Sequence, residues 1–250
     1  MVLSMLSIII ITYNEEEHLP RLLSSIKNQK YRDFELIVSD AKSKDRTVAI
    51  AKEYGCKIIS GPRLGPSYGR NLGAKVAGGD HFLFLDADVA LTTKDCLEHY
   101  LSLFKSKHLA AATVNLEPDS GKIVDQVMYH LWNAWQMLTQ KTDPHALGAF
   151  ILVNKSVFEK IGGFDESVKY AEDAAFARKS KEFGKFAVLK GPSLLVSTRR
   201  LESQGRIRTA YNLVAAGIYR TIFGEIKRKK HFTHQAGDCA DVVNPAQINT

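Results

Sequence analysis

The sequence has few cysteines and no pattern that would join them. Cys56, Cys96 and Cys239 are the three cysteines in a chain of 250 residues, and no C-x-x-C spacing occurs. We therefore expect neither a disulfide framework nor a thiolate zinc site, and this cysteine usage favours a reducing cytoplasm. Internal repeats and a linker-like segment are lacking as well, so the sequence predicts one domain with a C-terminal extension.

Long hydrophobic runs are also absent. The apolar N-terminus, residues 1–11, is too short to cross a bilayer and lacks the basic start of a signal peptide, so it predicts a buried strand. A composition of 45% hydrophobic and 24% charged residues is that of an ordinary globular chain, and the length suffices for one large core.

Acidic residues are scarce in the C-terminal part of the chain. The formal net charge is +7, and residues 199–230 carry nine basic residues against the two acidic residues Glu202 and Glu225. The nine are Arg199, Arg200, Arg206, Arg208, Arg220, Lys227, Arg228, Lys229 and Lys230. Such a block suits a phosphate-rich ligand or an anionic membrane surface, with a solvated helix face as the alternative. We predict no nucleic-acid partner.

Apolar strand-like runs alternate with amphipathic helical segments in the first half of the chain. Strands are predicted at residues 6–11, 34–39, 57–60 and 81–85, and helices at about 19–26, 45–54, after 65 and at 97–104. This alternation predicts an α/β fold with a mostly parallel, Rossmann-like sheet covered by helices on both faces. The second half predicts helices at 123–139, 172–183 and 204–226 and a strand at 147–153.

Two carboxylates follow the fourth predicted strand, at the edge where parallel sheets bind ligands. Asp86 and Asp88 are two residues apart in an extended segment and therefore point to the same side. Carboxylates combined with substrate phosphates are the usual ligands of Mg²⁺ and Mn²⁺. The pair predicts a divalent-metal site, with an acidic turn before the next helix as the alternative.

Six short motifs follow one another along the chain. They are IIITYNEE at 9–16, DAKSKDRT at 40–47, GRNLG at 69–73, FLDAD at 84–88, GGFDE at 162–166 and ED at 172–173. In this order they resemble the motifs of glycosyltransferase family 2, over roughly residues 6–200. The resemblance implies the GT-A fold, a UDP-, GDP- or dTDP-linked sugar as donor, and Mg²⁺ or Mn²⁺ as cofactor.

The resemblance implies that residues after the first two strands hold the nucleoside. These residues are Thr12, Tyr13, Asn14 and Glu15, together with Asp40 near the base. Capping of a strand end is the alternative for Thr12 and Tyr13. Ala41 and Lys42 replace the glycines that the family usually has after this aspartate, which leaves the identity of the base open.

The same resemblance implies contacts to the diphosphate and the metal. Asp88 would ligate the metal that bridges the diphosphate, and Asp86, separated from it by Ala87, would face the ribose or the metal. Arg70 would help to bind the nucleotide; the alternative is a surface residue paired with Asp80.

An acceptor hydroxyl loses its proton as it attacks the donor sugar, so an inverting transferase needs a carboxylate base. By resemblance the base falls at the acidic pair, with Asp173 as the first candidate and Glu172 in reserve. A helix start stabilised by acidic residues is the alternative. Residues 148–150 resemble the small-residue strand on which donor sugar and acceptor sit, and Arg199 is the expected arginine contact to the diphosphate.

Two amphipathic helices bear on the acceptor. The stripe in helix 123–139 is Val124, Met128, Leu131, Trp135 and Leu138, beside Trp132, and that in the last helix is Ile207, Tyr211, Val214, Ile218 and Ile222. A basic run, residues 227–230, follows the second stripe. Three interpretations stay open: packing on the domain itself, a homodimer partner, and a membrane surface.

These features predict a metal-dependent, inverting glycosyltransferase that moves a sugar from a nucleotide-diphosphate donor to a hydroxyl or phosphate acceptor. The expected acceptors, in falling order of preference, are a polyprenyl phosphate, a lipid-linked sugar and a soluble glycan. The expected location is the cytoplasm, with peripheral attachment to the inner face of the membrane. A non-catalytic nucleotide-sugar-binding protein or membrane-associated scaffold is the alternative. The predicted units are a GT-A domain at 1–200, an amphipathic basic helix at 201–230 and an irregular tail at 231–250.

Overall fold

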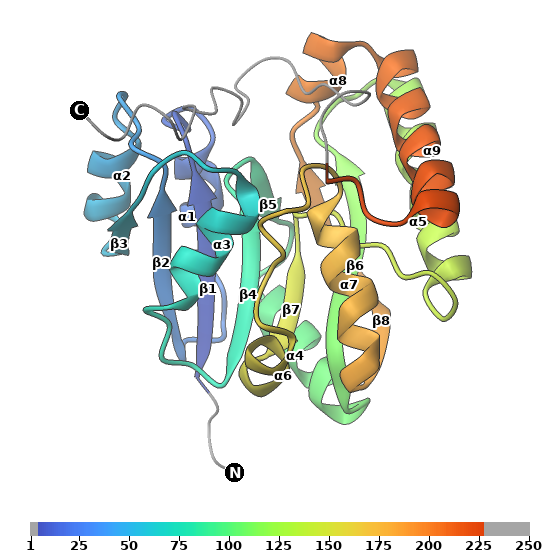
Figure 1. Ribbon diagram of the computed structural model, residues 1–250. Helices are drawn as coiled ribbons and strands as arrows, with labels where there is room; N and C mark the ends of the chain where they lie inside the picture. Colours follow the sequence, from blue (N-terminus) through green and yellow to red (C-terminus); the bar gives the residue numbers. More distant parts are fainter. Residues whose placement is uncertain (1–4, 228–250) are drawn as a thin grey trace, which may run out of the picture.

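The computed structural model describes residues 5–227, which fold around one eight-stranded sheet with the strand order β3-β2-β1-β4-β7-β6-β8-β5 (Figure 1). The strands are β1 Leu6–Thr12, β2 Phe34–Asp40, β3 Lys57–Ser60, β4 His81–Asp86, β5 Val89–Leu91, β6 Leu109–Pro118, β7 Ile151–Asn154 and β8 Lys185–Val196. The α-helices are α1 Leu19–Lys27, α2 Thr47–Glu53, α3 Pro66–Ala74, α4 Cys96–Ser106, α5 Ile123–Thr139, α6 Lys155–Ile161, α7 Glu172–Ser180, α8 Arg199–Gln204 and α9 Arg206–Phe223.

The first half of the sheet is parallel. Strand β1 pairs with β2 on one side and β4 on the other, and β2 pairs with β3, all in parallel. The register joins Thr12 to Asp40 and Ile11 to Asp86, so the carboxyl ends of β1, β2 and β4 lie at one edge. The motifs predicted from the sequence therefore meet there.

The second half of the sheet mixes directions. Strand β7 is antiparallel to both β4 and β6, β6 is parallel to β8, and β5 is antiparallel to β8. The pairing of Val89 with Val196 brings the chain around Asp88 beside the start of α8. The sequence did not predict β5, β6 or β8.

Alternating side chains of β1, β2 and β4 enter two separate cores. Ile8 and Ile10 of β1 join the core packed by α1, α2 and α4, whereas Ile9 joins the core packed by α3, α6 and α7. A strand that is buried on both faces has no polar side to expose, which is why β1 is an unbroken apolar run. The α/β prediction of a mostly parallel, Rossmann-like sheet with helices on both faces is confirmed.

Some boundaries differ from the prediction. The expected helix at 204–226 is divided by Gly205, whose φ of 84° lies in the region that glycine adopts freely. The expected strand at 147–153 begins at Ile151, and the helix at 172–183 changes to a 3₁₀ turn after Ser180. Residues 228–230 of the basic run and the tail at 231–250 lie outside the described residues. Within residues 5–227, every helix is too short or too polar to cross a membrane.

Candidate active site

Thr12 and Asp40 meet at the carboxyl ends of neighbouring strands. The Thr12 hydroxyl donates to Oδ1 of Asp40 over 3.0 Å, and the Ser43 backbone N–H donates to Oδ2 of Asp40 over 2.9 Å. Both Thr12 and Asp40 are buried, at 4% and 2% exposure. These bonds fix the carboxylate at the edge where the sequence predicted contact with a base.

The loop after β2 is tied to the loop after β1. The Asn14 side-chain oxygen accepts from the Lys44 backbone N–H over 2.9 Å, and the Asn14 N–H donates to the Ser43 hydroxyl over 2.9 Å. Asn14 and Lys42 both adopt positive φ angles, 52° and 61°. Lys42 stands where the family usually has glycine, so its loop keeps a glycine-like backbone in spite of the substitution.

Replacing the exposed Lys42 by glycine is expected to stabilise the protein by roughly 0.5–1 kcal/mol. The left-handed conformation costs a residue with a Cβ about 1–2 kcal/mol, and the greater chain entropy of glycine offsets about half of this gain. Chemical denaturation measures the change. Lys44→Gly is the matched control, because Lys44 has no positive φ; we expect it to destabilise. A loss of stability in Lys42→Gly would contradict the argument.

Tyr13 and Glu15 continue the first loop. The guanidinium carbon of Arg63 lies 3.7 Å from the centroid of the Tyr13 ring, and the Glu15 N–H donates to the Thr47 hydroxyl over 2.7 Å. A cation over an aromatic face is attracted by the ring. The contact places Arg63, which the sequence did not single out, beside the residues predicted to bind the nucleoside.

Arg199 joins two carboxylates that are far apart in sequence. Its Nε donates to Asp88 Oδ2 over 3.1 Å and its Nη2 to Glu15 Oε1 over 2.6 Å, although Arg199 and Glu15 are 184 positions apart. The side chains of Asp88 and Glu15 are each 12% exposed. Burial is the largest influence on Glu15 and raises the pKa of its carboxyl, against the opposing effect of Arg199.

Arg70 lies beneath the metal-binding candidates rather than at the surface. It is 2% exposed, and it donates through Nη2 to Asp86 over 3.0 Å and through Nη1 to Glu172 over 2.8 Å. The alternative of a surface pair with Asp80 is therefore wrong. Burial opposes the positive charge, but Asp86 and Glu172 outweigh it and raise the pKa of Arg70.

Gly148 leaves room for the buried Arg70 between Asp86 and Glu172. A Cβ at this position would lie 2.0 Å from Nη2 of Arg70 and 3.1 Å from Oδ1 of Asp86. The backbone of Gly148 can therefore approach the buried arginine only without a side chain. The same residue donates its N–H to Asp173 Oδ2 over 2.7 Å.

Asp173 begins α7 opposite the strand ends. Its second oxygen accepts from the Ala174 N–H over 2.7 Å. Burial and the neighbouring charge of Glu172 raise the pKa of Asp173 to about 7, which suits a group that accepts a proton near neutrality. Ala171, just before the acidic pair, has a φ of 56°. Backbone strain of this kind is often found at functional sites.

Asn71 is a positioning residue that the sequence analysis named only as part of a motif. Its amide nitrogen donates to the Phe164 carbonyl over 2.9 Å, and its amide oxygen accepts from the Phe164 N–H over 2.8 Å. A Cβ on Gly163 would lie 2.6 Å from the same amide oxygen. The G-R-N-L-G and G-G-F-D-E motifs therefore lock together and hold α7 against α3.

The carboxylates at the strand ends do not form a closed metal cage. Among residues 5–227, no group of three or more His, Cys, Asp or Glu side chains is arranged to hold a metal ion. Asp86 and Asp88 flank Ala87, which is 3% exposed. One or two carboxylates are what Mg²⁺ uses when phosphates supply further ligands, so the metal prediction for this pair stays open.

The ends of β1, β2 and β4 and the acidic start of α7 carry the motifs that resemble glycosyltransferase family 2. The chain belongs to glycosyl transferase family 2, whose family model matches residues 7–162. The family predicted from the six motifs is therefore confirmed.

Solved structures have the same fold. A mannosyltransferase, PcManGT from Pyrobaculum calidifontis in complex with GDP-Man and Mn²⁺, matches with a TM-score of 0.68 and 21% identity, over 84% of this chain and 60% of that chain. TarS 1–349 of S. aureus in complex with UDP matches with a TM-score of 0.64 and 23% identity, over 86% of this chain and 65% of that chain. These likenesses support the GT-A fold.

Curated relatives are glycosyltransferases of several kinds. The O-antigen chain rhamnosyltransferase RfbN of Salmonella typhimurium is 29% identical over 193 residues, 72% of this chain and 62% of the relative. A 4,4'-diaponeurosporenoate glycosyltransferase of Staphylococcus haemolyticus is 41% identical over 100 residues, 37% of this chain and 26% of the relative. The chain thus spans less than two thirds of the length of either relative.

Proposed function

We propose that the protein transfers a sugar from a nucleotide-diphosphate donor to an acceptor, with inversion at the anomeric carbon. The observation that carries the proposal is the meeting of three strand ends with Asp173. Asp40 and Asp86 end β2 and β4 beside Thr12, and Arg70 and Gly148 connect Asp86 to the acidic start of α7. A donor lying along the strand ends would have its sugar between Asp86 at the end of β4 and Asp173 at the start of α7.

The nucleoside belongs at the ends of β1 and β2. Asp40 is fixed by Thr12 and Ser43, and Tyr13 is covered by Arg63, so the loops offer a carboxylate and an aromatic ring to a base. Structures with this fold contain UDP, UDP-GlcNAc or GDP-Man. Those ligands support a nucleotide donor here without selecting its base.

The carboxylates of Asp86, Asp88 and Glu15 are the candidate oxygen ligands for a hard divalent ion, and in the structure Arg70 and Arg199 pair with them. Asp88 and Glu15 converge on one arginine, and Oε2 of Glu15 is buried with no hydrogen-bond partner among the described residues. We assign Mg²⁺ or Mn²⁺ to Asp88, with Asp86 as the second carboxylate. The ion, when bound, offsets the charge that develops on the leaving nucleoside diphosphate, and Arg199 supplies further positive charge from the protein.

Asp173 is the proposed general base. Its carboxylate is held by the backbone N–H groups of Gly148 and Ala174, so it points to a fixed place opposite the strand ends. It takes the proton of the attacking hydroxyl while the bond from the sugar to the diphosphate breaks. Glu172 is engaged by Arg70, which leaves it a positioning role.

The acceptor is proposed to be a lipid-borne phosphate or sugar, with a soluble glycan as the less favoured choice. The helices next to the site, α5 and α9, have strongly apolar outer faces, and the C-terminal segment is basic. An acceptor held in or at a bilayer suits both features.

A thermal-shift panel of UDP-, GDP- and dTDP-linked sugars, with and without Mn²⁺, tests the donor site. A ligand at 100 times its dissociation constant adds about 2.7 kcal/mol of stability, which for a chain of this size raises the melting temperature by roughly 5–10 °C. We expect donors of one base to do so in the presence of Mn²⁺. The corresponding nucleoside, without diphosphate, is the control.

Failure of every donor to stabilise the protein would contradict the proposal. Donor binding without any turnover would favour the non-catalytic alternative.

A further inference from the structure

Helix α5 buries polar side chains and exposes apolar ones. Its buried residues are Asp125 and Gln136, at 0% and 1% exposure. Its exposed apolar side chains are Ile123, Val124, Val127, Leu131, Trp135 and Leu138, with Leu131 at 66% and Leu138 at 82% exposure. Within residues 5–227, Leu131 and Leu138 therefore do not pack into the core, whereas Trp135 also contacts the ring of His145. A helix of this kind presents its apolar face to something outside its own fold.

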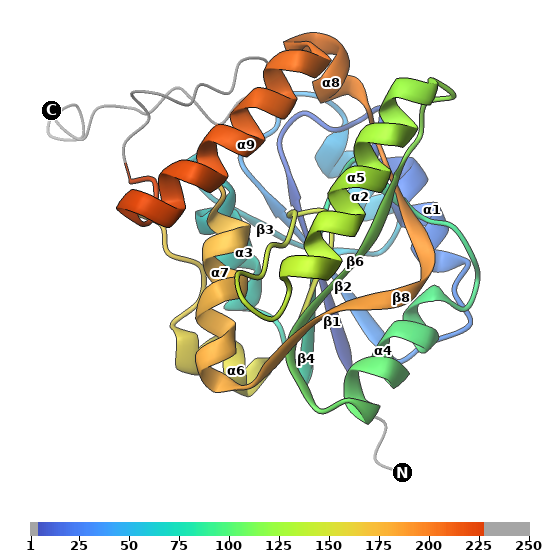
Figure 2. The ribbon, with the colours of Figure 1, turned by 90° about the vertical axis from the view of Figure 1, so that its right-hand side faces the viewer.

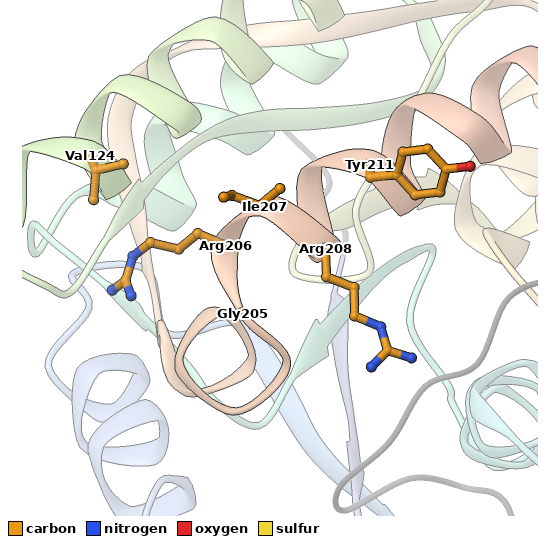
Figure 3. Close-up of a pocket in the computed structure, with 6 residues that line it drawn as sticks. All are labelled: Val124, Gly205, Arg206, Ile207, Arg208 and Tyr211. Carbon is orange, nitrogen blue, oxygen red and sulfur yellow. The ribbon is translucent and has the colours of Figure 1, made fainter.

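Helix α9 lies on the same side of the molecule as α5 (Figure 2) and also carries exposed apolar residues. Ile207, Tyr211 and Val214 follow helical spacing and are 89%, 70% and 63% exposed. The start of α9 and Val124 of α5 line a shallow apolar hollow, in which Figure 3 shows Ile207 between the diverging side chains of Arg206 and Arg208. We call the exposed apolar side chains of both helices the α5/α9 surface.

One ion pair joins α5 to the start of α9, and a second joins the segment before α5 to α8. Arg206, at the start of α9, donates to both oxygens of the buried Asp125 of α5 over 2.6 and 2.9 Å. Lys122, just before α5, pairs with Glu202 of α8 over 2.7 Å. The α5/α9 surface is therefore part of the folded domain and is presented as a unit.

Basic residues outnumber acidic ones among the exposed described residues at the edge of this surface. Lys122 and Arg208 are exposed at its edge, and Lys122 pairs there with the exposed Glu202. An apolar surface bordered by lysine and arginine matches the interface of an anionic bilayer. A symmetric pair of copies would instead bring the basic edge residues of both copies together, because the same patch meets itself.

The inner sides of the same helices border the candidate active site. Tyr129 of α5 faces inward, where burial and then the charge of Asp88 raise its pKa to about 12. Arg220 of α9 contacts the ring of His145 over 2.9 Å, in the loop that leads to Gly148 and its bond to Asp173. A surface that binds through the outer sides of α5 and α9 therefore lies next to the place where an acceptor would enter.

We propose that the α5/α9 surface docks on a bilayer containing anionic lipid. Leu131, Leu138, Ile207 and Tyr211 insert among the acyl chains near the headgroups, while the basic residues around them contact lipid phosphates. This docking is independent of the glycosyl-transfer proposal. Where both hold, it brings a lipid-borne acceptor beside Asp173.

Flotation with vesicles tests the docking without donor or acceptor. The probes are vesicles of phosphatidylcholine alone and of phosphatidylcholine with about one quarter phosphatidylglycerol, at about 0.15 M salt. We expect the full chain to bind the anionic vesicles and the triple variant Leu131→Ser/Ile207→Ser/Tyr211→Ser to bind at least about tenfold more weakly. Phe183→Ser is the matched control, since Phe183 is an exposed aromatic residue in the turn after α7 and belongs to neither α5 nor α9; its loss should leave binding unchanged.

Tryptophan fluorescence supplies a second readout, because both tryptophans of the chain, Trp132 and Trp135, lie in α5. Brominated lipid should quench the wild-type emission and leave that of the triple variant nearly unchanged. No binding by wild type, or equal binding by the triple variant, would overturn the proposal. It would also be overturned if the triple substitution converted a dimer to monomers without weakening vesicle binding. Donor-induced stabilisation of the triple variant shows separately that its fold and donor site are intact.

Discussion

Replacing Asp173 by asparagine is expected to slow metal-dependent hydrolysis of the donor sugar by about 10²–10⁴-fold. Water, like an acceptor hydroxyl, must lose a proton as it attacks, so this assay needs no knowledge of the acceptor. The amide oxygen can accept a hydrogen bond from Gly148 or Ala174 but not from both, so the melting temperature of the ligand-free variant checks its fold. Release of the nucleoside diphosphate measures the rate, and the thermal shift with donor measures binding, which we expect to stay the same.

The pH dependence gives the same prediction a second test. A base works in its deprotonated form, so the wild-type rate should rise with pH and level off above the pKa of Asp173, which is about 7. The residual rate of Asp173→Asn should lack this rise. Glu182→Gln, at an exposed carboxylate in the turn after α7, is the control and should behave as wild type. Full activity in folded Asp173→Asn would remove Asp173 from the mechanism.

Replacing Arg70 by glutamine is expected to lower the free energy of unfolding by about 3–5 kcal/mol. Arg70 is almost completely buried and pairs with both Asp86 and Glu172. Removing one member of a buried charge network leaves the others without compensation. Urea denaturation measures the loss. The rise of activity with pH should also move to higher pH, because the charge of Arg70 lowers the pKa of Asp173.

Two further variants define the cause of this loss. Arg70→Lys keeps the charge but not the planar fork that reaches both carboxylates, so its stability should fall between wild type and Arg70→Gln. Arg21→Gln removes an exposed ion pair with Asp119 over 3.0 Å, and it should cost less than about 1 kcal/mol. A change in Arg70→Gln no larger than that in Arg21→Gln would contradict the assignment of Arg70 as the centre of the network.

The first half of the fold could be predicted because its signals are local. Strands β1, β2 and β4 are apolar runs that end in polar residues, and their parallel pairing follows from the helices between them. The polar residues at those ends, such as Thr12, Asp40 and Asp86, had to share one edge of the sheet. The long helix α5 has the bounds that its spacing predicted, Ile123–Thr139.

The second half depends on contacts that leave no local pattern. Strand β6, Leu109–Pro118, is rich in alanine, and its place in the sheet follows from pairing with β7 and β8. The contact of Arg199 with Glu15 joins residues that are 184 positions apart in the sequence. The burial of Arg70 likewise depends on the absence of a side chain at Gly148. The resemblance to the family identified Arg70 and Arg199 as site residues, but the sequence did not predict which carboxylates each arginine contacts.

Helix α5 illustrates the limit of a periodic pattern. Its apolar stripe was correctly found, but spacing alone does not reveal whether a stripe faces inward or outward. The buried ion pair between Asp125 and Arg206 fixes the polar side inward, and Leu131 and Leu138 are left outside. The direction of the stripe therefore changes its interpretation from core packing to a binding surface.

The most direct test of the donor site compares wild type with Asp88→Asn in the same thermal-shift measurement, using the best donor with and without Mn²⁺. Asparagine keeps the shape of the side chain, and Arg199 can remain bonded to its oxygen, so the ligand-free protein should be little changed. We predict that Mn²⁺ strengthens donor stabilisation of wild type and has no such effect on Asp88→Asn. An equal Mn²⁺-dependent shift in both proteins would contradict the assignment of the metal to Asp88.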